Sequence, residues 1–257
     1  MLMQAVFFMA GIAILVQAYP IGPVGGRIPV IMGTSIAFVT GIIVIGREYG
    51  LAAVFGACLV ASVVEILLGF SISRLRTLFP PLVNGIVVML IGLTLIPVGM
   101  DYAAGGVAAA DYGAPVNLLM AGVVFLVTLL LNRFGKGFLR HASLLVGVVT
   151  GYALAIALGR VDFSAVSDAG LLAARRPLAF GLEFHVDAIL LMAFIYVISA
   201  METIGDISGT LAAVDRDATT QELRGGLVAD GVMSGLAALF SAFPNTSYSQ
   251  TVGLVNF

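Results

Sequence analysis

Long apolar runs follow one another along almost the whole chain, and they constrain the fold more than any other feature of the sequence. A helix that spans a bilayer needs roughly 20 mostly apolar residues. Such runs lie near residues 3–18, 28–46, 50–72, 80–99, 115–131, 142–159, 186–204 and 226–243, and the stretch 246–257 begins another. The sequence therefore predicts an all-α, multi-pass integral membrane protein in contact with the lipid bilayer.

Composition agrees with this prediction and excludes other classes of protein. Of the 257 residues, 60% are hydrophobic and 10% are charged, against roughly 25% charged residues in soluble domains. The 12 Lys and Arg residues lie in short clusters, which excludes a continuous basic patch for nucleic acid. The single cysteine, Cys58, lies in an apolar run, and zinc and haem spacings are absent from the sequence. We expect no cofactor and no metal.

The loops predict an orientation. Basic clusters follow the third, fifth and seventh runs, whereas the loop after the fourth run has neither Lys nor Arg. The positive-inside rule makes the three basic loops cytoplasmic, so residue 1 enters from the external side. The long loop 160–185 is then external despite its three arginines, because the rule is strongest for short loops. A bacterial carrier that starts outside is unusual, so we expect one span to be missing before Met1.

Glu202 and Asp206 lie in and just beyond the run 186–204. An ionisable group at bilayer depth costs about 2.5 to 3.5 kcal/mol on insertion scales, so it needs a partner, a cavity or a function. Residues four apart share a helix face. Two neighbouring carboxyl groups away from water rarely both stay ionised, so the pair predicts a proton-binding site. The alternative is that Asp206 lies near a helix end and is solvated.

Two more acidic residues lie inside apolar runs. Asp230 lies among four glycines of the segment 225–235, and such small residues let helices approach closely. Asp230 is predicted either to bond a neighbouring helix or to relay a proton. Glu65 is predicted to bond a neighbouring helix, because intramembrane acids face the bundle interior.

Two segments look like interrupted membrane spans. In YPIGPVGGRIPVIMGTSIAF, three prolines and four glycines prevent a continuous helix, and RIPVIMG predicts a short strand. In FPNTSYSQTVGLVNF, Pro244 is predicted to end the preceding helix. Irregular backbone at membrane depth lines cavities, and paired broken segments mark the substrate site of transporters. For the second segment, an extramembrane loop is the alternative.

Four ordered motifs, QAYPIGPVGGRIPVIMGTSIAF, SAMETIGDISG, LRGGLVADGVMSG and FPNTSYSQTVGLVNF, resemble the nucleobase-ascorbate transporter (nucleobase-cation symporter-2) family. Within it, the similarity is to bacterial xanthine and uric acid permeases. The resemblance implies fourteen spans in two inverted repeats of seven, with short strands in spans three and ten. It also implies proton-coupled uptake of a purine nucleobase across the cytoplasmic (inner) membrane, and a homodimer. The sequence leaves open whether protons or sodium ions are coupled.

The resemblance also implies a domain division. Residues 1–113 correspond to spans two to five, of which two to four belong to a core domain and five begins a gate domain. Residues 114–185 correspond to gate spans six and seven with an external loop, and 186–257 to core spans eight, nine and the start of ten. Because Phe257 precedes the threonine of the family signature and spans eleven to fourteen, we expect the chain to be a fragment.

Residue roles carry over by motif. Glu202 corresponds to the glutamate that binds the base, and Asp206 to a position that is acidic in purine carriers. Asp230 corresponds to the aspartate of span nine. The resemblance therefore implies that Glu202 binds substrate, and that proton coupling involves Asp206, Asp230 and Glu202.

The closing segment and the first interrupted segment complete the implied substrate site. Gln250 and Gly253 match the signature Q-N-x-G-x-x-x-x-T, in which Thr251 replaces the usual Asn and removes a side-chain carbonyl. Ser35 and Ile36 match the strand of span three that faces the base.

Three alternatives stay open from the sequence. One is a carrier of another nucleobase such as uracil, or of an anion, on the same fold. An anion carrier would present cations or helix N-termini, and the segments next to Glu202 and Gln250 contain neither Lys nor Arg. An enzyme would need a nucleophile with a base or a metal, and Cys58, His141 and His185 offer no such set. The third is a non-transporting, truncated membrane protein.

Overall fold

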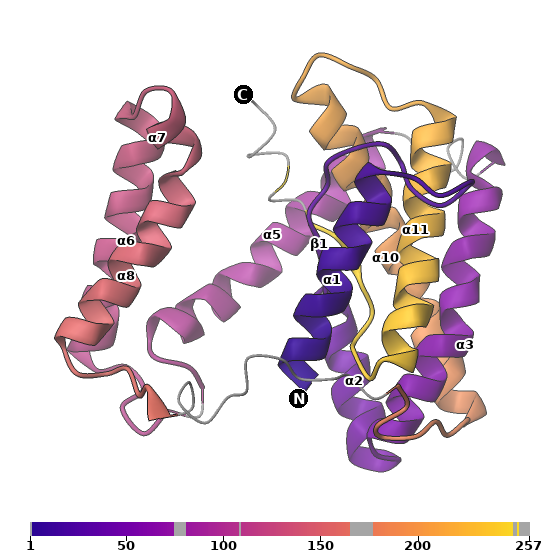
Figure 1. Ribbon diagram of the computed structural model, residues 1–257, viewed down its shortest axis with the longest axis horizontal. Coiled ribbons are helices and arrows are strands. Elements are labelled where there is room, and N and C mark those ends of the chain that lie inside the picture. Colours follow the sequence, from indigo (N-terminus) through magenta and orange to yellow (C-terminus); the bar gives the residue numbers. More distant parts are fainter. Residues whose placement is uncertain (1, 75–80, 108, 165–176, 249–250, 252–257) are drawn as a thin grey trace. The chain divides into compact units, whose positions relative to one another are not determined.

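The computed structural model describes residues 2–74, 81–107, 109–164, 177–248 and 251, most of which are helical (Figure 1). Among these residues, three helices are long and apolar enough to cross a membrane: α3 (Leu51–Phe70), α6 (Pro115–Phe134) and α10 (Val186–Ala212). Two shorter helices, α1 (Leu2–Ala18) and α8 (Ser143–Ala157), are also apolar. The predicted helical membrane protein is confirmed at this level.

The remaining elements complete two compact units. These elements are β1 (Met32–Gly33), α2 (Ala37–Glu48), α5 (Pro81–Ala103), α7 (Phe138–His141), α11 (Thr220–Leu239) and β2 (Thr246–Ser247). The first unit holds Met1–Met89 and Ala174–Asn256, and the second holds Leu90–Ala173. Helix α5 therefore begins in the first unit and ends in the second.

In the first unit, α10 and α11 lie side by side and both pack against α3 (Figure 1). Small residues of α11 allow the close approach to α3. A Cβ atom added to Gly231 would lie 2.6 Å from Cγ1 of Ile66 and 2.9 Å from the carbonyl oxygen of Ser62. The glycines around Asp230 therefore serve helix packing, as the sequence indicated.

The proline-rich loop after α1 is anchored to α1 and α11. The side-chain oxygen of Gln17 accepts from the backbone N–H of Gly26 at 3.3 Å, and the N–H of Gly25 donates to the carbonyl of Gly225 at 2.9 Å. Gly25 has a φ of 116°, which a side chain would strain. The backbone groups that the prolines and glycines leave outside a helix are thus partly satisfied by neighbouring helices.

The two interrupted segments pair with each other. Strands β1 and β2 are antiparallel, with Met32 opposite Ser247 and Gly33 opposite Thr246. On the two sides of this pair, the N–H of Tyr248 donates to the carbonyl of Ile31 at 2.9 Å, and the Tyr248 hydroxyl donates to the carbonyl of Thr34 at 3.0 Å. The strand predicted over RIPVIMG is limited to Met32–Gly33.

Three helix boundaries in α10 and α11 differ from the prediction. Helix α10 continues to Ala212, and α11 begins earlier than predicted because Thr219 and Glu222 form a capping box. Pro244 was predicted to end the helix before it, which is wrong. Helix α11 ends at Leu239, and Ser241, with a φ of 55°, turns the chain before Pro244 is reached.

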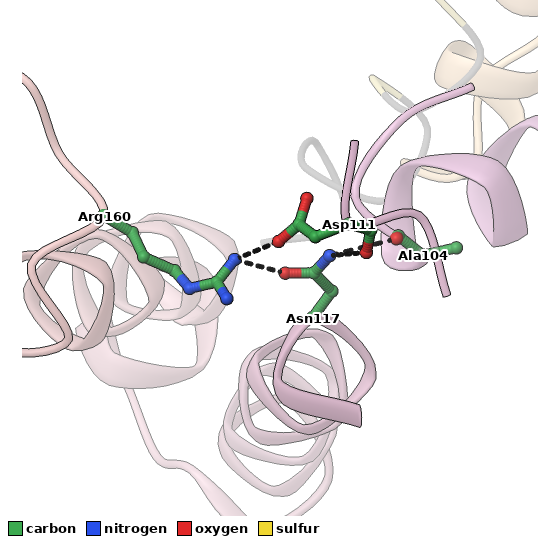
Figure 2. Close-up of polar contacts among 4 residues, drawn as sticks. All are labelled: Ala104, Asp111, Asn117 and Arg160. Carbon is green, nitrogen blue, oxygen red and sulfur yellow. Dashed lines mark hydrogen bonds and ion pairs between the residues drawn. The ribbon is translucent and has the colours of Figure 1, made fainter. Parts of the chain in front are cut away.

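In the second unit, α6 packs against α7 and α8. A buried asparagine at the start of α6 joins three segments of this unit, as Figure 2 shows. The Nδ2 atom of Asn117 donates to the carbonyl oxygens of Ala104 at 3.1 Å and Asp111 at 2.9 Å, and its Oδ1 accepts from Arg160 at 2.9 Å. Arg160 also forms a 2.5 Å ion pair with Asp111. The charge of this arginine, which lies in a loop predicted to be external, is thus compensated.

Candidate functional site

Eight buried polar side chains line the contact between α10, α11 and the paired strands. We call them the polar cluster, and they are Ser35, Ser199, Glu202, Thr203, Asp206, Asp230, Thr246 and Ser247. Four of them come from α10 at positions 199, 202, 203 and 206, a spacing that places them on one face of the helix. The exposed fractions of Glu202, Asp206 and Asp230 are 5%, 1% and 0%. The solvated alternative for Asp206 is therefore wrong.

Glu202 is held by the first interrupted segment. The hydroxyl of Ser35 donates to Oε2 of Glu202 at 3.0 Å, and the same oxygen of Ser35 accepts from the N–H of Ala37 at 3.1 Å, where α2 begins. A carboxylate has two acceptor oxygens. Glu202 can therefore accept from a ligand N–H while it keeps the bond from Ser35.

A chain of hydrogen bonds joins Asp206 on α10 to Asp230 on α11. The Ser247 hydroxyl lies 3.0 Å from Oδ2 of Asp206 and 3.3 Å from Oγ1 of Thr203, and the Thr203 hydroxyl donates to Oδ2 of Asp230. Since a hydroxyl carries one proton, Ser247 donates either to Asp206 or to Thr203. The chain can therefore reorient when one of the two acids gains or loses a proton.

Thr246 of β2 and Ser199 of α10 supply the other two hydroxyl groups of the cluster. The Oγ1 atom of Thr246 lies 3.1 Å from Oγ1 of Thr203 and accepts from the Ser199 hydroxyl at 3.1 Å. On α11, the Ser234 hydroxyl donates to the carbonyl of Asn245 at 2.8 Å and its oxygen accepts from the N–H of Asn245 at 3.0 Å. The interrupted segment before β2 is thus held by side chains rather than by a longer sheet.

The predicted site residues differ in how the structure places them. Ser35 and Ile36 were expected on a strand, and this is wrong: both follow β1, and Ile36 directly precedes α2 and is 47% exposed. The hydroxyl of Thr251 accepts from the N–H of Ile31 at 3.1 Å. Gln250 and Gly253 lie outside the described residues.

The structure also places two further acids, Asp230 and Glu65, and one hydroxyl group, that of Thr203. Asp230 bonds the neighbouring helix through Thr203, as one of its two predicted roles required. Glu65 is fully buried, and on its neighbouring helix α10 the Ser199 hydroxyl acts on its carboxyl group. Because that hydroxyl donates to Thr246, neither oxygen of Glu65 has a hydrogen bond of normal geometry in the described part of the chain. Thr203, the centre of the cluster, was missed, although its spacing from Glu202 and Asp206 places it on the same face.

A separate cavity of about 390 Å³ lies at the start of α11 and shares no residue with the polar cluster. Arg27 and Arg224 line it, together with Glu222, which pairs with Arg216 at 2.8 Å. Burial opposes ionisation of Glu222, but the bonds from Thr219 and Arg216 outweigh it and lower the pKa of this carboxyl. Within the described residues, groups of three or more His, Cys, Asp or Glu that could hold a metal do not occur.

The whole chain, residues 1–257, matches the family model Xan_ur_permease, which is described as a permease family. The chain belongs to this family. It is 42% identical over 99% of its length to a protein of Clostridium perfringens (strain 13 / Type A) named as a candidate purine permease. It is 38% identical over 96% of its length to the xanthine permease of Bacillus subtilis (strain 168), and 39% identical over its full length to the uric acid transporter UacT of Escherichia coli (strain K12).

This permease chain covers only part of each relative. It spans 56% of the Clostridium protein, 57% of the Bacillus permease and 54% of UacT. These relatives are named as permeases and transporters, in agreement with the predicted class of membrane protein.

Proposed function

We propose that the protein is a secondary active transporter that takes up xanthine or uric acid across the cytoplasmic membrane, coupled to protons. The observation that carries this proposal is the pairing of β1 with β2 beside three buried acids. Paired breaks in membrane segments are where transporters bind substrate. The names of the relatives supply the substrate class.

Base recognition follows from the acceptors and donors of the polar cluster. Xanthine and urate carry N–H donors and C=O acceptors around a flat rim. Glu202 is proposed to accept a ring N–H, with Ser35 holding its carboxylate in place. From the sequence, the Gln250 amide is proposed to donate and accept along the imide edge, with Ile36, Thr251 and Gly253 nearby. A base that leaves these groups unpaired would be rejected.

Proton coupling is proposed to use the hydrogen-bonded chain from Asp206 to Asp230. A proton on either acid, or on Glu202, removes a buried negative charge that is costly inside a membrane. The Ser247 and Thr203 hydroxyls connect Asp206 and Asp230, so the charge at one acid affects the other. The loaded, protonated site would then be the form that moves.

The larger architecture is part of the same proposal. We take β1 and β2 as the strands of spans three and ten in a fold of two inverted seven-span repeats. The core domain would comprise spans two to four and eight to ten, and the gate domain would begin with span five and include spans six and seven over 114–185. A homodimer through the gate domains completes the proposed assembly.

Uptake of radiolabelled xanthine, urate and uracil tests this function in cells that express the protein from its own gene. We expect xanthine or urate to accumulate, a protonophore to abolish accumulation, and Glu202→Gln to remove it. Glu48→Gln, which changes an exposed acid at the end of α2, is the matched control. Uptake of uracil in preference to purines would contradict the substrate class, dependence on sodium ions would contradict proton coupling, and no uptake would contradict transport.

A further inference from the structure

Glu65 of α3 is a buried acid that the proposed substrate site does not use. Its side chain is 0% exposed. The Ser199 hydroxyl acts on its carboxyl group but donates its proton to Thr246, so both carboxyl oxygens are left without a donor among the residues that the structure describes. An ionised carboxylate that is buried and unpaired is strongly unfavourable. Glu65 therefore needs either a proton or another cation to be accommodated at this position.

Asp230 of α11 lies near Glu65 because the two helices approach closely. Gly231 lies against Ser62, which is about one helical turn before Glu65 on α3, and against Ile66, which directly follows Glu65. Glu65 is close enough to Asp230 for the two carboxyl groups to repel each other when both are ionised. Oδ2 of Asp230 accepts from Thr203, whereas Oδ1 is buried and has no hydrogen-bond partner within the described ranges. Both oxygens of Glu65 are thus without a donor, whereas the Thr246 hydroxyl and the N–H of Ser247 also act on the Asp230 carboxylate.

The other ionisable groups around Glu65 offer no compensating positive charge. From α10, Glu202 acts on Glu65 as a second negative group, and the Tyr196 phenol also interacts with Glu65. Tyr196 donates its hydroxyl to the carbonyl of Cys58 at 3.3 Å, so this proton is already used. Helix α2, which also packs on α3, has its charged residues Arg47 and Glu48 exposed at its end. In the described residues, the groups that act on Glu65 electrostatically are therefore acidic or neutral.

We propose that Glu65 and Asp230 share one exchangeable proton and form a second proton site behind the polar cluster. Glu65 carries the proton as its O–H group while Asp230, ionised, keeps the bond from Thr203. Transfer breaks the O–H bond of Glu65 and forms one on Asp230, so one negative charge remains in the pair throughout. Through Thr203 and Ser247 the pair is linked to Asp206. The coupling of this proton to transport rests on the proposed function, whereas the shared proton does not.

Infrared difference spectroscopy of the protein in lipid nanodiscs tests the shared proton directly. We expect a carboxylic-acid C=O band at neutral pH that Glu65→Gln removes and the control Glu48→Gln retains. Gln has the size of a protonated Glu, so this variant should keep the fold. If Glu65→Gln removes carboxylate bands and leaves the carboxylic-acid band, then Glu65 is ionised and the proposal is overturned. A band that changes when sodium ions replace choline would overturn it in favour of sodium.

A second variant separates sharing from protonation of Glu65 alone. In Asp230→Asn the band of Glu65 should remain but move in frequency, because the group that accepts its O–H has changed. An unchanged frequency would contradict the sharing.

Xanthine binding, measured beside the spectra across pH, distinguishes this inference from the proposed function. Glu65→Gln should bind xanthine within about twofold of the parent at neutral pH, with a shallower dependence on pH. A protein that shows the band and binds no purine would contradict the proposed function alone. A protein that binds purine and lacks the band would contradict the proton site alone.

Discussion

The hydroxyl of Ser35 donates to Oε2 of Glu202 at 3.0 Å and so ties the start of α2 to the polar face of α10. If Glu202 binds the base, its orientation depends on this bond. A hydrogen bond contributes about 1 kcal/mol, so Ser35→Ala should weaken xanthine binding about fivefold. Equilibrium binding of radiolabelled xanthine measures the change. Ser73→Ala, at an exposed position, is the matched control and should have no effect; equal affinities for all three proteins would contradict the role of Ser35.

Helix packing at Gly231 predicts a loss of stability when a methyl group is added. In Gly231→Ala the new Cβ would lie 2.9 Å from the backbone nitrogen of Ile66 as well as against its side chain, and such overpacking costs about 1 to 3 kcal/mol. The thermal unfolding midpoint should therefore fall. Gly11→Ala makes the same change in α1, where nothing lies within 4 Å, and should raise the midpoint slightly or leave it unchanged. A similar response of the two variants would show that α3 and α11 are not packed as described.

Substitution of Asn117 should lower the stability of the second unit, formed by Leu90–Ala173. Asn117→Ala leaves the carbonyl groups of Ala104 and Asp111 without this donor and removes an acceptor from Arg160 (Figure 2). Loss of buried hydrogen bonds of this kind costs about 1 to 3 kcal/mol. Denaturant unfolding of the two variants Asn117→Ala and Asn132→Ala provides the comparison, because Asn132 is exposed on the same helix. Equal stability of both would contradict the role of Asn117.

Because of Tyr49, in the turn between α2 and α3, we expect the stability of the fold to decrease at high pH. Its hydroxyl donates to Asp187 at 2.5 Å, and this bond, together with desolvation, raises the pKa of Tyr49 from 10.0 to about 12. The folded protein holds this proton more tightly than the unfolded chain does. The contact therefore stabilises the fold below pH 10, and its contribution is lost as the pH rises through about 12.

Tyrosinate absorbance measures this titration, with Tyr49→Phe subtracted to isolate the residue. The signal should appear near pH 12 in the parent and move toward 10 in Asp187→Asn. A signal near pH 10 in both proteins would contradict the hydrogen bond.

The sequence predicted the polar face of α10 because a helix has a fixed period. Glu202 and Asp206 are four residues apart, and any helix through both places them together. The same period places Thr203 beside them, but threonine is common in apolar helices and carries no charge, so it did not stand out. The acids could therefore be predicted, and the hydroxyl that joins them could not.

The pairing of Met32 with Ser247 depends on contacts between distant parts of the chain. Composition indicated that both segments are interrupted, because proline and glycine act locally. The register and the short length of the pair follow from side chains elsewhere, such as Ser199 and Thr203, which hold Thr246. The family resemblance implied that Ser35 lies on a strand, which is wrong. Its actual position at the start of α2 is what brings its hydroxyl to Glu202.

Binding of radiolabelled xanthine to the protein in nanodiscs shows whether the polar cluster is a purine site. Parent, Glu202→Gln and Glu48→Gln proteins are compared at the same pH and salt concentration. We predict saturable binding by the parent and by Glu48→Gln, and its loss in Glu202→Gln. The amide keeps one acceptor oxygen and replaces the other with an NH2 donor, so separate oxygens can no longer accept from Ser35 and from the ring N–H. Saturable binding that Glu202→Gln leaves unchanged, or no saturable binding by the parent, would show that the polar cluster is not a purine site.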